Sequence, residues 1–149
     1  KEKFKMYSFR KSKKGFTLIE LMVVVAIIGV LALLGLRLYT GQQVKAKNAI
    51  VKANAGTVQT LIQAELADST SGEVDTMVGN AGAPSALIEN SGIHVPDGDA
   101  QKINSSPDAD IGFVYVVYDA TSEGSEFFEI NGNAFDGGDV YDTPLTARK

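Results

Sequence analysis

The stretch KKGFTLIELMVVVAIIGVLALLGL, Lys13 to Leu36, decides the fold, because a nearly uninterrupted apolar run follows a basic segment. From Phe16 to Leu36 there are 21 residues, of which fourteen are Leu, Ile, Val or Phe. A helix that crosses the hydrocarbon core of a bilayer needs about 20 residues of this kind. Glu20 is the only charged residue in the run. The run therefore predicts a membrane-spanning helix with a single carboxylate near its start.

The expected free energy of insertion favours this span despite Glu20. Fourteen apolar residues contribute about −6 kcal/mol together, whereas an acidic residue at the membrane centre costs about +3 kcal/mol and less near an end. A secretory signal would place a small-residue cleavage site after the run, and no such site follows. Gly15 is the only small residue at the polar-to-apolar border, and a cut there would keep the helix in the mature protein.

Charge is divided among three zones of the 149 residues. Residues 1–15 contain seven Lys or Arg and one acid, whereas the part after Asn54 contains three basic and sixteen acidic residues. The basic segment predicts a cytoplasmic N-terminus. The acidic body argues against strong nonspecific binding of nucleic acid by a single chain. The chain has no cysteine, which excludes disulfides and thiol chemistry.

The pattern Lys13-Lys14-Gly15-Phe16-Thr17-Leu18-Ile19-Glu20, followed by the apolar run, resembles the class III signal sequence of type IV prepilins. The resemblance implies that prepilin peptidase recognises Lys13 and Lys14, cuts between Gly15 and Phe16, and methylates the new amine of Phe16. It also implies that Glu20 is the acidic residue that the family uses in assembly.

One position departs from the family pattern. Arg37 stands where many members have a proline near the end of the apolar half-helix. Any kink would then have to arise at Gly29, Gly35 or Gly41, because glycine is about 1 kcal/mol worse than alanine in a helix.

The remaining chain predicts an α+β fold in which a long N-terminal helix packs on a small antiparallel sheet, as in type IV pilins. We expect a leader at residues 1–15, an apolar half-helix at 16–42 and a globular domain at 43–149. Within this domain, residues 43–67 predict an amphipathic helix, because apolar residues recur at helical spacing. The members of this stripe are Val44, Val51, Ala55, Val58, Ile62 and Leu66, with Leu61 beside them.

Residues 68–110 predict a loop region, with one short helix in PSALIENSG that Gly92 ends. Residues 111–142 predict the sheet. The strongest strand is Ile111–Asp119, a second is Glu126–Ile130 beyond a turn at residues 121–125, and Asn131-Gly132 is a hairpin signal. A third strand would begin near Ala134 and leave a piece at residues 139–142. Residues 143–149 show no packing pattern and predict a mobile tail.

No motif predicts catalysis, a cofactor or a metal site. His94 is the only histidine and lacks the context of a catalytic triad. Six aspartates lie in glycine- or proline-rich loops, where calcium binding is conceivable, but they do not have EF-hand spacing. They are Asp97, Asp99, Asp108, Asp110, Asp136 and Asp139. We therefore predict that the protein is not an enzyme.

The resemblance implies a structural function, namely the major subunit of a type IV pilus. The subunit would wait in the cytoplasmic membrane, lose its leader to the peptidase, and be assembled by the pilus machinery with copies of itself or other pilins. The surface filament would support motility, adhesion or DNA uptake. Two alternatives remain open. One is a minor pilin or a secretion-system pseudopilin, and the other is a membrane-anchored extracellular binding module.

Overall fold

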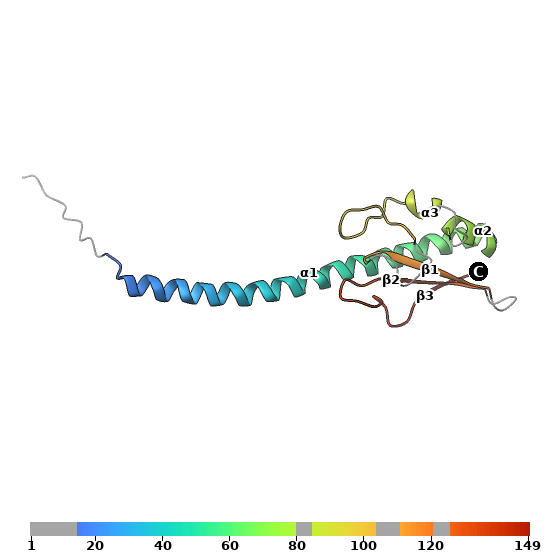
Figure 1. The fold of residues 1–149 in the computed structure, drawn as a ribbon. Helices are drawn as coiled ribbons and strands as arrows, with labels where there is room; N and C mark the ends of the chain where they lie inside the picture. The colour runs from blue at the N-terminus through green and yellow to red at the C-terminus, as the bar shows by residue number, and fades with distance from the viewer. Residues whose placement is uncertain (1–14, 80–84, 104–110, 121–125) are drawn as a thin grey trace, which may run out of the picture. The chain divides into compact units, whose positions relative to one another are not determined.

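The computed structural model describes residues 15–79, 85–103, 111–120 and 126–149, and the chain divides into two compact units at residue 39 (Figure 1). The first unit holds the apolar part of a helix, and the second holds the remaining elements. In chain order these are α1 (Leu18–Asp68), α2 (Ser71–Val78), α3 (Ala86–Glu89), β1 (Val114–Asp119), β2 (Phe127–Gly132) and β3 (Leu145–Arg148). A long helix with an antiparallel sheet confirms the α+β class.

Helix α1 is continuous through all three glycines that could have kinked it, Gly29, Gly35 and Gly41. It is also continuous through Arg37, where many family members have a proline. Arginine keeps the backbone N–H that proline would remove, so the i to i−4 hydrogen-bond ladder continues.

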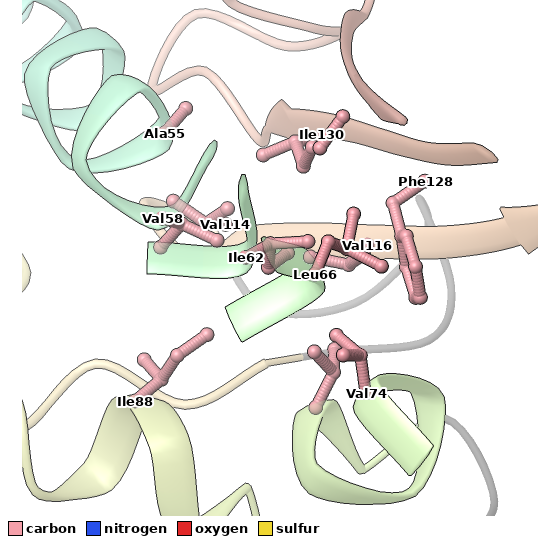
Figure 2. Packing of buried hydrophobic residues seen from close by; sticks show 12 residues of the cluster. Ala55, Val58, Ile62, Leu66, Val74, Ile88, Val114, Val116, Phe128 and Ile130 are labelled. Carbon is pink, nitrogen blue, oxygen red and sulfur yellow. The ribbon is translucent and has the colours of Figure 1, made fainter. Parts of the chain in front are cut away.

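The core of the second unit forms around the predicted apolar stripe of α1. Val51, Ala55, Val58, Ile62 and Leu66 are at most 1% exposed, which confirms the stripe, and Val44 is half-buried. Figure 2 shows four members of the stripe, Ala55, Val58, Ile62 and Leu66, between the sheet on one side and α2 with α3 on the other. Burial of an aliphatic side chain of this size stabilises a fold by roughly 1.5–3 kcal/mol. Each buried member of the stripe therefore stabilises this unit, together with the apolar side chains that pack on it.

The sheet has the strand order β1-β2-β3, with both pairs antiparallel. Val116 lies opposite Ile130, and Phe128 lies opposite Ala147. These four side chains are fully buried against α1 because alternate residues of a strand point to the same face. The two predicted strands are present with shifted ends, and the predicted turn at residues 121–125 lies outside the described residues.

The predicted hairpin at Asn131-Gly132 is wrong, because both residues belong to β2. The chain turns later, at residues 134–138, between the bridge partners Asn133 and Asp139. The predicted strand piece at 139–142 is also wrong. The buried Asn131 side chain holds that segment instead: its Oδ1 accepts from the Tyr141 N–H at 3.1 Å, and its Nδ2 donates to the Tyr141 carbonyl at 2.9 Å. A side chain thus replaces a strand partner.

The prediction of an unstructured tail at residues 143–149 is wrong as well, because β3 lies there. Two glutamines of α1 bind the outer edge of this strand. Gln59 Nε2 donates to the Thr146 carbonyl at 2.8 Å. Gln63 Nε2 donates to the Arg148 carbonyl at 2.6 Å, and its Oε1 accepts from the Arg148 N–H at 3.3 Å. The strand is therefore paired on both sides, by β2 and by side chains from about 85 residues earlier.

The predicted loop region contains α2, which the loop assignment missed. Thr70 and Glu73 form a capping box, in which the Thr70 N–H donates to Glu73 at 2.9 Å and the Glu73 N–H donates to the Thr70 hydroxyl at 3.4 Å. These bonds from the Thr70 N–H and hydroxyl hold the pKa of the Glu73 carboxyl below its usual value. The predicted short helix is present as α3, but it ends at Glu89 with Asn90 as its C-cap, before Gly92. Residues 80–84 and 104–110 of this region lie outside the described part.

Candidate assembly site at the start of the long helix

Gly15 and Phe16, the residues of the expected cleavage, lie just before α1. Residues 15–17 are not helical, and the Phe16 side chain is 86% exposed. A Cβ placed on Gly15 would meet no atom within 4 Å. Nothing in the described fold therefore shields this peptide bond from an enzyme. Lys13 and Lys14, the expected recognition residues, lie outside the described residues.

Glu20 folds back onto Thr17 and caps the first turn of α1. The Thr17 N–H donates to Glu20 Oε2 at 2.8 Å, and the Thr17 hydroxyl donates to the same oxygen at 2.7 Å. In return, the Glu20 N–H donates to the Thr17 hydroxyl oxygen at 3.3 Å. This reciprocal pair is a capping box, which satisfies backbone donors that a helix start leaves free. The spacing Thr-x-x-Glu is the sequence signal of this capping box.

The capping box uses only one oxygen of the carboxylate. Both donors of Thr17 bind Oε2, and within the described residues no bond to Oε1 is present. A carboxylate has about four acceptor sites over its two oxygens. Glu20 can therefore hold the helix start and accept a further donor at the same time.

Around this carboxylate, α1 presents a continuous apolar surface. Every residue from Gly15 to Gln43 is exposed, and the aliphatic side chains between Leu18 and Leu38 are 47–76% exposed. Among the described residues, α1 is the one helix long and apolar enough to cross a membrane, and its most apolar window is wholly unburied. Soluble monomers rarely expose contiguous apolar patches of this extent. This surface requires lipid or other protein chains to cover it.

The other residues considered from the sequence belong to the second unit. His94 is exposed in a loop, with Nδ1 2.9 Å from the Gly92 carbonyl oxygen. Asp97 pairs with Lys47 at 2.6 Å, and Asp136 accepts from the Asn48 amide at 2.8 Å. The described residues contain no cluster of three or more His, Cys, Asp or Glu that could hold a metal ion.

Residues 10–36 match the prokaryotic N-terminal methylation motif, so the match covers the capping box and the first part of the apolar surface. The probable minor fimbrial protein of Dichelobacter nodosus is 36% identical over 124 residues, which are 83% of this chain and 74% of that protein. Type IV major fimbrial protein FimA of the same organism is 32% identical over 93 residues, or 58% of each chain. Fimbrial protein EcpB of Eikenella corrodens is 47% identical over 55 residues. No solved structure matches the chain significantly.

The match to the minor fimbrial protein extends through most of both chains, beyond the N-terminal motif. The chain belongs to the type IV pilin family. It spans 58% of the length of FimA and 35% of the length of EcpB in these alignments. The long helix with a small antiparallel sheet is consistent with the pilin fold.

Proposed function

We propose that this chain is a structural subunit of a type IV pilus. It is anchored in the cytoplasmic membrane by α1 with its N-terminus in the cytoplasm. Prepilin peptidase cuts between Gly15 and Phe16 and methylates the Phe16 amine, and the assembly machinery then adds the subunit to a surface filament. The filament supports motility, adhesion or DNA uptake.

The observation that carries this proposal is the exposed apolar part of α1 with one carboxylate at its start. A helix for permanent anchoring alone needs no acid in its apolar layer, where an unpaired carboxylate is costly. A helix that leaves lipid and packs against sister helices can use the same apolar surface in both environments. The division of the chain at residue 39 supports this assignment, because the apolar part and the folded domain are separate compact units.

Processing is tested by Gly15→Leu, which places a bulky residue at the proposed cut. We expect the wild-type filament protein to begin at methylated Phe16 by mass spectrometry and the variant to stay uncut in the membrane. Gly29→Leu is the matched control, because it makes the same change inside the helix, where a Cβ also meets no atom within 4 Å. Surface filaments that retain residues 1–15 would contradict the proposed processing.

Within this function, Glu20 sets the register of the incoming helix. Cleavage creates a cationic amine on Phe16, and both this amine and the Glu20 carboxylate are costly when unpaired in an apolar layer. Glu20 of an incoming subunit pairs with the Phe16 amine of a subunit already in the filament. Because Oε2 serves the cap, Oε1 is the oxygen for this pairing. Apolar contacts alone would let the helices slide.

Three variants separate the charge of Glu20 from its capping role. Glu20→Gln keeps a capping residue but removes the charge, Glu20→Val removes both, and Thr17→Val removes the capping hydroxyl but keeps the charge. We expect normal cleavage of all three. Filament yield should fall at least tenfold in both Glu20 variants and by less in Thr17→Val. Abundant, ordered filaments of cleaved Glu20→Gln alone would show that the charge of Glu20 is not needed for assembly.

A second candidate is a minor pilin of the same filament. The observation that favours it is the extent of the match, because the relative aligned over 83% of this chain is a probable minor fimbrial protein, whereas the FimA alignment covers 58%. Copy number decides between the two. We expect this chain to dominate sheared filaments by quantitative mass spectrometry, and a few copies per filament would assign it to the minor class.

A further inference from the structure

Two lysines of α1 form no ion pair with an acid among the described residues, in a domain with a large surplus of acid. Lys45 and Lys52 are exposed and seven residues apart, about two helical turns, so they share one face of α1. Among the described residues, the one ion pair is Lys47 with Asp97. Lys52 lies instead over the Tyr141 ring, with Nζ 5.3 Å from the ring centroid. Two cations are thus available to a carboxylate from outside the domain.

The lysines line a groove of about 410 Å³ between α1 and the turn at residues 134–140. Asp136 and Asp139 lie on its other wall. Both aspartates have partners within the domain: Asp136 accepts from the Asn48 amide, and Asp139 accepts from the Tyr115 hydroxyl. Both acids therefore have hydrogen-bond partners, whereas within the described residues neither ammonium group forms an ion pair.

A complementary acid lies at the other end of the domain, where α1 gives way to α2 (Figure 1). Asp68 is exposed and forms no ion pair among the described residues. The nearby Glu73 carboxylate is bound in the capping box, and the Lys149 ammonium donates to the Ser69 carbonyl at 3.0 Å. The other two acids near this corner are less accessible, because Asp75 is half-buried with its Oδ1 shielded from solvent and Glu65 accepts from the Ser69 hydroxyl. Asp68 is thus the most exposed acid here without an ion-pair partner among the described residues.

Helix geometry places the two patches so that parallel copies can bring them together. At about 100° per residue, Asp68 lies about 150° around α1 from the midpoint of Lys45 and Lys52, and about 29 Å further along the axis. Two parallel copies that are shifted mainly along their axes meet through opposite faces. Such a contact is heterologous, so it repeats along a filament without closing.

We propose that Lys45 and Lys52 of one copy bind Asp68 of a second, parallel copy displaced by about 29 Å along the helix axis. This inference rests on the proposed assembly into a filament. It gives the folded domains a charged register contact of their own, separate from the pairing of Glu20 with the Phe16 amine. Because the groups are exposed, salt screens the contact.

The absence of cysteine allows a direct test with the full chain in filaments. Lys52→Cys combined with Asp68→Cys places one thiol on each patch, and a thiol-specific cross-linker about as long as a lysine side chain is then applied to sheared filaments. The matched control combines Asp68→Cys with Lys102→Cys, since Lys102 is also an exposed lysine but lies outside α1. We expect a ladder of cross-linked oligomers from the first pair and at least tenfold less from the control.

Filaments in which both pairs cross-link equally, or in which neither does, would overturn this contact and leave the proposed function standing. Absence of filaments in the wild type would instead remove the proposed function and this contact with it. If the double-cysteine variant does not assemble alone, it is co-expressed with an excess of wild-type subunits. Each single-cysteine variant is co-expressed in the same way as a control.

A charge exchange gives a second measurement. We expect Lys52→Asp and Asp68→Lys each to lower filament yield at least fivefold, and the combined variant to restore it. Failure of the combined variant to recover would count against the pairing.

Discussion

Removal of the amide side chains of Gln59 and Gln63 should open β3 while the rest of the domain stays folded. β3 is the edge strand of the sheet, and its outer side is bound by these two glutamines. Gln63 makes two hydrogen bonds to the Arg148 backbone, at 2.6 and 3.3 Å, and Gln59 makes one, at 2.8 Å, to the Thr146 carbonyl. We therefore predict a local effect in the double variant Gln59→Ala with Gln63→Ala.

The size of the effect follows from the number and exposure of these bonds. A neutral hydrogen bond contributes roughly 0.5–1.5 kcal/mol net, and exposed bonds lie at the low end because water replaces the lost partner. Three such bonds give about 2 kcal/mol for opening of β3, or about a 30-fold rise in the open population. Alanine is a better helix former than glutamine by less than about 0.7 kcal/mol per residue, so α1 itself should not weaken.

The assay is native-state hydrogen exchange on a truncated protein that begins at Gln43, which we expect to be a soluble monomer. The Ala147 amide reports on β3, because its register partner is Phe128 of β2. The Val58 amide reports on the core of α1. We expect exchange at Ala147 to rise about 30-fold and exchange at Val58 to stay within about threefold.

Thr60→Ala is the control, because Thr60 lies on the same stretch of α1 and its hydroxyl binds Gly56 of the helix itself at 3.0 Å. It should leave both amides unchanged. An unaltered Ala147 rate in the double variant would refute the idea that glutamines hold β3. A rise of equal size at both amides would mean that the substitutions lower global stability and that β3 does not open separately.

Three further predictions concern the core of the domain. Gly132→Ala should destabilise it by about 1–3 kcal/mol in urea denaturation, because the new Cβ would overlap Val51 Cγ1, and the added change Val51→Ala should reduce the penalty of the glycine substitution. Ile62→Asp places a charge at a fully buried position and should unfold the truncated protein by circular dichroism. Burial, helped by a hydrogen bond to Asp139, raises the pKa of Tyr115 to about 12, above the value near 10 of an unfolded tyrosine. Stability should therefore fall as pH rises from 10 to 12, because only the unfolded state loses the Tyr115 proton there, and the fall should be smaller in Tyr115→Phe.

Local patterns in the sequence determine the long helix and the candidate site at its start. The apolar run from Phe16, the stripe from Val51 to Leu66 and the strand centred on Val116 follow from periodicity and propensity, which act between residues close in the chain. The Thr17–Glu20 capping box was also within reach of the sequence, since its Thr-x-x-Glu spacing is a local signal. The same spacing at Thr70 and Glu73 marks the start of α2.

The C-terminal part of the sheet depends on contacts between segments that are distant in the chain. β3 alternates apolar and polar residues over only four positions, Leu145 to Arg148, and Ala147 is its one fully buried residue, so the local signal is short and weak. Its partners are β2 and glutamines of α1 some 85 residues away. Gly132 pairs with Val114 in β2, and Val51 of α1 packs where a side chain at position 132 would be, so this position requires glycine. Propensity alone had assigned Asn131-Gly132 to a turn. Contacts between residues so far apart in the chain leave no periodic pattern, and packing against α1 overrides the local preference.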